Sequence, residues 1–245
     1  MDARLKTRFK KHLLETVGKE PGKKEMTLVF RKLKEEYSML YGKPNKPLPV
    51  IRKSFNSLSA IWPTLVAGTS SFSEITLLTK YAKISRNLNI TSIASGLCVF
   101  ELFLAKEFVP NGKIFCLDLS EEMNKRAKAL KRKLKQKNIN IVTASATKIP
   151  VKSNSQDIVL ARRTGLSNDK RWTAVLKEAY RILKKNPSSR FIYTVATDFN
   201  KPVKNIKKDM DRAGLEFIAI EKFGVKEKRP AFMIIACVKN IQQLL

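Results

Sequence analysis

The residues that first suggest chemistry are a set of small side chains followed, further along the chain, by a single carboxylate. Ala94, Gly96 and Cys98 come directly after the β-rich residues 90–93, and Asp118 closes a second apolar stretch. A turn of small residues lets a ligand approach the backbone, and a helix that starts there offers free N–H groups. A carboxylate at the tip of the next strand can accept hydrogen bonds from two ribose hydroxyls. The pattern therefore predicts a nucleotide or nucleoside site.

These residues need a strand–helix–strand unit to position them. Residues 90–93 and 114–117 are expected to form buried strands, and residues 99–108 form a helix with apolar side chains at helical spacing. Further strands are expected at residues 139–143, 157–160, 191–195, 217–221 and 231–238, and further helices at residues 121–137, 172–183 and 201–213. This alternation predicts an α/β fold with a doubly wound sheet, and the last two strands are expected to pair antiparallel.

The same segments resemble the class I S-adenosylmethionine-dependent methyltransferases. Residues 118–123 match the family's Asp-x-Ser-x-x-Met, and residues 178–184 resemble its Glu-x-x-Arg-Val-Leu-Lys. Residues 165–166 resemble part of the Phe-Gly-Leu of the ubiquinone–menaquinone C-methyltransferase-like group, within methyltransferase type 11. The resemblance covers about residues 70–240, and it implies a seven-stranded Rossmann-like sheet.

The resemblance also implies a cofactor, S-adenosyl-L-methionine, and a set of residues that bind it. The expected cofactor-binding residues are Ser92, Ala94, Gly96, Cys98, Asp118, Leu119, Ser145 and Ala146. Asp118 is expected to bind the ribose, and Ser145 and Ala146 to lie near the adenine. Ala94 and Cys98 replace the outer two of the family's three loop glycines, so the glycine loop is degenerate.

The acceptor side is expected to follow the fourth strand, where Arg162 and Arg163 lie. Arginines in a cleft favour an anionic substrate, although one of the two as a plain surface side chain remains an open alternative. The Asn/Asp-Pro-Pro-aromatic motif of base-amine methyltransferases is absent, and so is a cysteine nucleophile at this position. Trp62 and Phe72, which precede the first strand, could form a lid or belong to the core.

The charge balance points to polyanions. The chain has 49 Lys and Arg against 21 Asp and Glu, a formal net charge of +28. Nucleic acid is the first explanation, an anionic membrane surface the second, and solvated lysine-rich helix faces the third. The residues expected to contact RNA phosphates are Arg4, Lys6, Arg8, Lys10, Lys11 and the basic helix of residues 125–137.

The chain is expected to comprise a basic helical extension with a linker, residues 1–49, and a methyltransferase-like domain, residues 50–245. Pro44, Pro47 and Pro49 predict the linker at residues 42–49, and Ser71 or Ser73 is a candidate N-cap for a helix that ends at residue 82. Cys98, Cys116 and Cys237 are too few and too far apart for a disulfide framework. This predicts a cytoplasmic location, with an organelle as the alternative. No metal site or membrane span is expected.

Two classes of function remain open on this sequence. The first is a methyltransferase that acts on ribosomal or transfer RNA docked on the basic surfaces. The second is a catalytically inactive protein of the same fold that binds RNA or ribosomes, because several cofactor positions are altered. A small-molecule methyltransferase of the quinone type is third, since the high charge argues against it.

Overall fold

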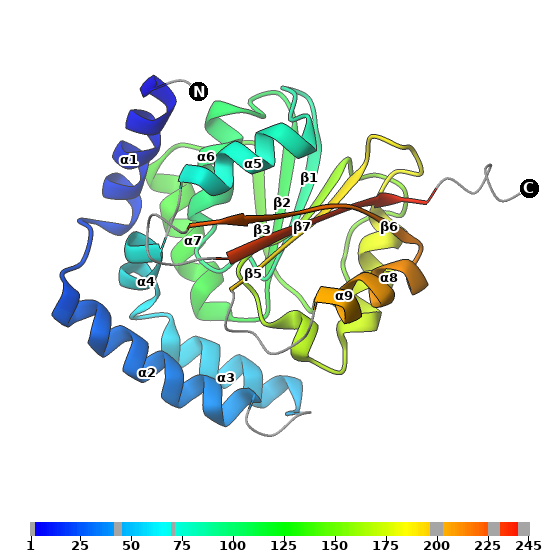
Figure 1. Ribbon diagram of the computed structural model, residues 1–245. Coiled ribbons are helices and arrows are strands. Elements are labelled where there is room, and N and C mark those ends of the chain that lie inside the picture. Colours follow the sequence, from blue (N-terminus) through cyan, green and yellow to red (C-terminus); the bar gives the residue numbers. More distant parts are fainter. Residues whose placement is uncertain (1–2, 42–45, 70–71, 197–202, 225–230, 240–245) are drawn as a thin grey trace, which may run out of the picture.

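The protein, described here from a computed structural model, is built on one sheet with helices on both faces (Figure 1). The structure describes residues 3–41, 46–69, 72–196, 203–224 and 231–239. The strands are β1 (Asn89–Ile93), β2 (Lys113–Asp118), β3 (Ile139–Thr143), β4 (Ile158–Ala161), β5 (Arg190–Ala196), β6 (Leu215–Phe223) and β7 (Ala231–Val238). The helices are α1 (Ala3–Val17), α2 (Lys23–Tyr41), α3 (Leu48–Leu58), α4 (Trp62–Thr69), α5 (Phe72–Ala82), α6 (Val99–Glu107), α7 (Glu121–Lys133), the 3₁₀ turn η1 (Leu166–Asn168), α8 (Trp172–Ile182) and α9 (Val203–Arg212).

The strand order in the described sheet is β3-β2-β1-β4-β5-β7-β6. β1 pairs in parallel with both β2 and β4, whereas β7 runs antiparallel to β5 and β6. The predicted seven-stranded doubly wound sheet and its antiparallel terminal pair are therefore confirmed. The order reverses between β1 and β4, so the carboxyl ends of the parallel strands meet at the edge where ligands bind in such sheets.

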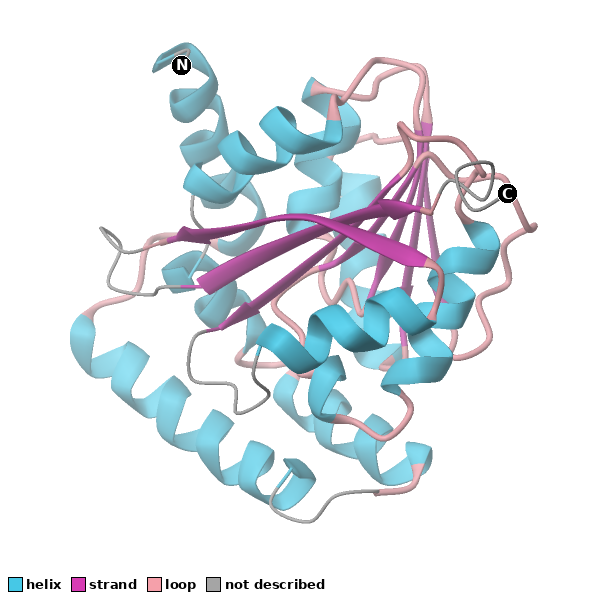
Figure 2. Cartoon of the chain, turned by 45° about the vertical axis from the view of Figure 1, so that its right-hand side comes forward, coloured by secondary structure: helices cyan, strands magenta, loops and turns pink. Residues whose placement is uncertain are grey.

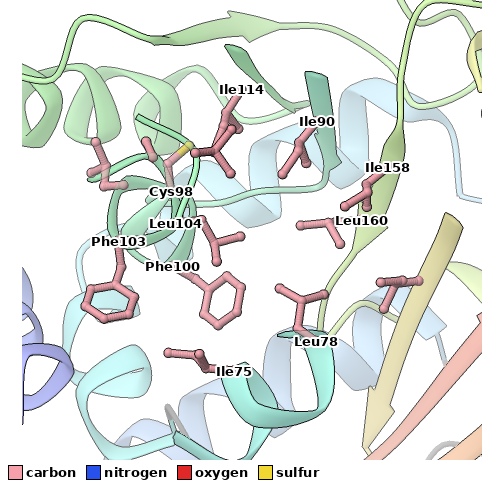
Figure 3. Close-up of a cluster of buried hydrophobic side chains, with 14 of the residues drawn as sticks. Ile75, Leu78, Ile90, Cys98, Phe100, Phe103, Leu104, Ile114, Ile158 and Leu160 are labelled. Carbon is pink, nitrogen blue, oxygen red and sulfur yellow. The ribbon is translucent and has the colours of Figure 1, made fainter. Parts of the chain in front are cut away.

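Both faces of the sheet are buried at its centre, which explains why β4 is apolar without alternation. In β4, Ile158 and Leu160 face one hydrophobic cluster, whereas Val159 and Ala161 face another. The first cluster packs under α5 and α6, as Figure 3 shows with Ile75 of α5. The second lies under α8 and α9, and Figure 2 shows helices on either side of the twisted strands.

Helix α1 is anchored to the core by aromatic contacts and a buried histidine. Phe9 is 2% exposed, and its ring centroid lies 5.0 Å from that of Phe103 in α6. His12 Nε2 donates to the backbone carbonyl of Val99 at 2.7 Å, and burial lowers the pKa of this imidazole. The basic helix α1 therefore also has a structural role, because it packs on α6, which covers one face of the sheet. The division of the chain at residue 49 stays a prediction.

Several predicted boundaries need correction. The linker was expected to run to residue 49, but α3 begins at Leu48, since Pro49 is tolerated in the first turn, where its missing N–H has no partner to lose. Ser73 lies inside α5 and is not an N-cap, while Ser71 lies outside the described residues. Helix α7 ends at Lys133 because Lys135 adopts a left-handed conformation at φ 53°.

The other differences concern strand ends. The fourth strand starts at Ile158, one residue later than predicted, and Asp157 just before it accepts the backbone N–H of Asn89 through its carboxylate. β6 is longer than residues 217–221 and carries an irregularity between Phe217 and Ala219. Within the described ranges, every helix is too short or too polar to span a lipid bilayer.

Candidate active site

A pocket lies at the carboxyl edge of the sheet, bounded by strand ends below and by α3 and α4 above. Most of the predicted cofactor-binding residues line it, namely Ala94, Gly96, Asp118, Leu119, Ser145 and Ala146. Arg163, one of the two acceptor-side candidates, also lines it. The loops after β1, β2, β3 and β4 thus converge on one space because parallel strands present their carboxyl ends together.

The loop after β1 keeps a backbone suited to glycine at residues that are mostly not glycine. Ala94, Gly96 and Cys98 all have positive φ angles, 51°, 54° and 54°. These are the three positions where the family pattern has glycine. A residue with a Cβ atom in this left-handed region is strained by about 1–2 kcal/mol. The degenerate loop therefore retains the glycine-type conformation at an energetic cost.

The carboxylate of Asp118 holds this strained loop in place through hydrogen bonds. Its Oδ2 accepts the backbone N–H of Gly96 at 2.9 Å, and its Oδ1 accepts that of Ser120 at 2.8 Å. Burial raises the pKa of the Asp118 carboxyl, and the backbone N–H groups oppose that shift. Because a carboxylate oxygen has more than one lone pair, Asp118 can accept further bonds from a ligand in the pocket.

Helices α3 and α4 cover the pocket, and sequence reasoning found only one residue of this cover. Trp62 lies directly over Gly96, where an added Cβ would sit 3.0 Å from the indole Nε1. Asn56 in α3 accepts a hydrogen bond from the hydroxyl of Ser120 at 2.7 Å, which ties the cover to the start of α7. Phe72 instead packs on Phe9 in the core. The apolar residues of α3 that line the pocket are Leu48, Ile51 and Phe55.

Three predicted site residues do not lie on the pocket wall. Ser92 is fully buried and donates to Glu101 Oε1 at 2.8 Å, and Cys98 is also fully buried. Arg162 lies beneath the wall, where its guanidinium stacks 3.5 Å from the centroid of the Phe100 ring. Ser145 does line the pocket, but its hydroxyl is already engaged with Thr147.

A buried ionic cluster supports the acceptor side. Glu74 of α5 accepts hydrogen bonds from Arg162 Nε at 3.0 Å and Nη2 at 2.9 Å, and from Arg163 Nε at 3.3 Å. Burial alone would raise the pKa of Glu74, but the two guanidinium groups hold it below its ordinary value. The sequence carried no signal for this cluster, because 88 residues separate Glu74 from Arg162.

Glu101 is the second carboxyl of this cluster and behaves differently. Its Oε1 lies 3.7 Å from Arg162 Nη1, and its buried Oε2 has no hydrogen-bond partner among the described residues. Burial raises the pKa of Glu101, and the more distant guanidinium of Arg162 opposes that shift only in part. Two carboxyl groups in one cluster therefore have pKa values pushed in opposite directions.

The strain at Ala94 predicts that Ala94→Gly stabilises the protein. Glycine relieves the left-handed strain, which exceeds the extra chain entropy it adds to the unfolded state, so the gain should be about 1 kcal/mol. Ala129→Gly, at an exposed position inside α7, is the matched control and should cost about 1 kcal/mol. Urea unfolding measures both, and equal losses in the two variants would show that Ala94 is unstrained.

The environment of Glu101 predicts that Glu101→Gln stabilises the protein in a pH-dependent way. When folding raises the pKa of a carboxyl, the folded protein loses stability as the pH rises from the unfolded-state pKa, 4.5 for glutamate, to the folded-state pKa. Glutamine keeps the acceptor for Ser92 and has no charge to bury, so its advantage over the wild type should grow above that pH and then level off. Urea unfolding from about pH 4 to about pH 8 tests this. A variant less stable at neutral pH would mean that Glu101 is an ionised partner of Arg162.

Comparison with known proteins agrees with this geometry. A family model described as a methyltransferase domain matches residues 90–186. Demethylmenaquinone methyltransferase of Listeria welshimeri is 29% identical over 105 residues, which cover 43% of this chain and 44% of that protein. The ubiquinone/menaquinone biosynthesis C-methyltransferase UbiE of Rickettsia bellii is 33% identical over 142 residues, 56% of this chain and 54% of that one. This chain thus matches about half the length of the curated relatives.

Solved structures share the fold at low identity. A SAM-dependent methyltransferase from Aquifex aeolicus superposes with a TM-score of 0.61 at 18% identity, covering 75% of this chain and 98% of that one. The [4+2]-cyclase SpnF superposes with a TM-score of 0.67 at 10% identity, covering 79% and 97%. The fold therefore does not by itself determine the reaction. With the sheet order, the pocket and the matched segment, the predicted resemblance to the class I methyltransferases is confirmed: residues 90–186 match a methyltransferase domain, and ubiquinone–menaquinone C-methyltransferases are among the chain's relatives.

Proposed function

We propose that the protein is a methyltransferase that uses S-adenosyl-L-methionine and methylates a small, largely apolar acceptor. The observation that carries this proposal is the carboxylate of Asp118 at the tip of β2, placed on a pocket wall beside the left-handed loop. A carboxylate suits ribose hydroxyls, and the apolar wall suits the uncharged parts of a nucleoside. The close cover of Trp62 over Gly96 suits a ligand without phosphates better than a dinucleotide.

When bound, S-adenosylmethionine supplies a methyl group already activated on a sulfonium, so the protein needs no strong acid or base. What remains for the chain is to bind, orient and exclude water. Ala94, Gly96 and Asp118 line one side of the pocket, and residues of α3 and α4 cover it. The loop after β4 provides the other side, fixed by the hydroxyl of Tyr193, which donates to the Thr164 carbonyl at 3.0 Å.

A small acceptor is favoured by the shape and chemistry of the enclosure. Leu48, Ile51 and Phe55 of α3 line the pocket together with Leu166 and Val175. Such a wall accommodates an apolar ring better than a polynucleotide backbone. Relatives named demethylmenaquinone methyltransferase support this acceptor class. A cytoplasmic location, consistent with cysteines that are free in the structure, belongs to the same proposal.

RNA is the second candidate acceptor, favoured by the basic face of α7 and its continuation. The exposed cations on this face are Lys125, Arg126, Lys128, Arg132, Lys133, Lys135 and Lys137. None of them forms an ion pair in the part of the chain that the structure describes. By contrast, Arg8 of α1 is paired with Glu107 at 2.6 Å, so α1 is the weaker candidate surface.

The cofactor proposal predicts that Asp118→Ala weakens S-adenosylmethionine binding about 10- to 100-fold, the expected effect of losing a charged hydrogen-bond acceptor. Isothermal titration calorimetry measures the affinity. Asp211→Ala is the control, because it removes an exposed carboxylate from α9 without touching the pocket. Circular dichroism verifies that both variants fold.

Failure of the folded wild type to bind at millimolar cofactor would reject the enzyme and leave the inactive RNA-binding alternative. Where binding is observed, incubation of the protein with cell extract and methyl-labelled cofactor distinguishes the two acceptors. Label in the fraction extracted by organic solvent supports the small acceptor, and label in RNA supports the second candidate.

The RNA candidate predicts a steep salt dependence that α7 controls. Replacing Lys125, Lys128 and Arg132 with glutamine should lower the slope of log affinity against log salt by about 3, one for each lost phosphate contact. The control replaces Lys152, Lys177 and Lys204, which are exposed and lie outside α7. Fluorescence anisotropy with a structured RNA at about 50 to 200 mM salt measures the slope. Equal slopes for the two triple variants would exclude α7 as the RNA-binding surface.

A further inference from the structure

The guanidinium of Arg163 is the one cation on the pocket wall whose hydrogen-bonding capacity is incompletely used among the described residues. Its Nε donates to Glu74 at 3.3 Å, whereas its buried Nη2 has no hydrogen-bond partner in the part of the chain that the structure describes. The other arginine on the wall, Arg171, is held by both carboxylate oxygens of Asp169. An unpaired buried donor is costly in a folded protein and calls for an explanation.

The charges around Arg163 are also incompletely neutralised. Glu74 faces two guanidinium groups, those of Arg162 and Arg163, and it also accepts a hydrogen bond from the hydroxyl of Thr194. The second carboxyl, Glu101, lies 3.7 Å from Arg162 and is not paired with Arg163. Arg162 takes the bidentate geometry, with its Nε and Nη2 on the two oxygens of Glu74. Arg163 therefore holds the positive charge that the cluster neutralises least.

The backbone of Arg163 is also held in an unfavourable conformation. Its φ angle is 48°, in the left-handed region that a long side chain rarely adopts. Its N–H donates to the hydroxyl of Thr194 at 2.8 Å, and its guanidinium lies 5.4 Å from the centroid of the Phe223 ring. Contacts from β5 and β6 thus fix the residue at the end of β4, beside the pocket. Strain of this kind persists where the surroundings determine the conformation, and it clusters at ligand sites.

From these contacts we propose that Arg163 determines acceptor specificity by binding an anionic oxygen, such as a phenolate, enolate or carboxylate, on the acceptor molecule. This inference rests on the proposed function and deepens it by naming a chemical group on the substrate. The free edge of the guanidinium donates to that oxygen, and Glu74 keeps the group oriented. Arg162, whose fork is occupied, acts as a positioning residue. An apolar ring with one anionic oxygen then fits both the α3 wall and the cation.

The test uses two probes of nearly equal shape, 2-naphthoate and 2-naphthamide, with the protein saturated in S-adenosylhomocysteine. Wild type should bind the carboxylate about 10- to 100-fold more tightly than the amide, as expected for a charge-assisted hydrogen bond. Arg163→Gln should remove this preference. Arg163→Lys, which keeps the charge but not the planar fork, should retain part of it. Lys148→Gln removes a nearby exposed charge and should leave the preference unchanged.

The outcomes separate this inference from the proposed function. Loss of S-adenosylhomocysteine binding by the wild type would reject the proposed function itself. If the wild type binds S-adenosylhomocysteine but shows no preference for 2-naphthoate over 2-naphthamide, only the role of Arg163 is overturned. This result needs no variant. A preference that survives Arg163→Gln, or that Lys148→Gln also removes, would assign it to general charge and overturn the inference.

Discussion

The carboxylate of Asp118 joins three parts of the chain at one point. It receives the N–H of Gly96 from the loop after β1 and the N–H of Ser120 at the start of α7. Ser120 in turn caps α7 by accepting the N–H of Met123 and donates to Asn56 in the helix that covers the pocket. The loop after β1, the start of α7 and the covering helix α3 are thus connected through one acidic group. Among the described residues no cation pairs with this buried group, and the backbone N–H groups supply the compensating dipoles.

The sequence predicted those parts of the fold that depend on local pattern. Hydrophobic runs and turn residues were sufficient for the positions of the strands, and the small residues before α6 were sufficient for the loop, whereas the seven-stranded sheet was implied by the family resemblance. What the sequence could not show is that Ala94 and Cys98 adopt the left-handed backbone that glycine normally provides. That conformation is supported by the hydrogen bond from the N–H of Gly96 to Asp118, a contact between the loop after β1 and the end of β2 that the loop residues alone do not reveal.

The acceptor side was less predictable for the same reason. Arg162 and Arg163 looked equivalent as neighbours after a strand. In the structure, Arg162 forms a bidentate pair with Glu74 and stacks on Phe100, whereas Arg163 lines the pocket. The partner that separates their roles comes from α5, before the first strand, and a polar residue in an amphipathic helix gives no sign of its distant partner. Similarly, Ser92 was expected to bind the cofactor, but its hydroxyl donates to the buried carboxyl of Glu101.

The anchoring of α1 has a consequence for how the chain folds during synthesis. His12 and its partner Val99 are separated by 87 residues. At the ribosomal rate of about 5–20 residues per second, α1 waits roughly 4 to 17 seconds before its docking surface on α6 exists. During that interval Phe9 and its apolar neighbours have no core to enter. The apolar face of α1 is therefore exposed to solvent in the nascent chain, and the many lysines and arginines around Phe9 favour its solubility during that interval.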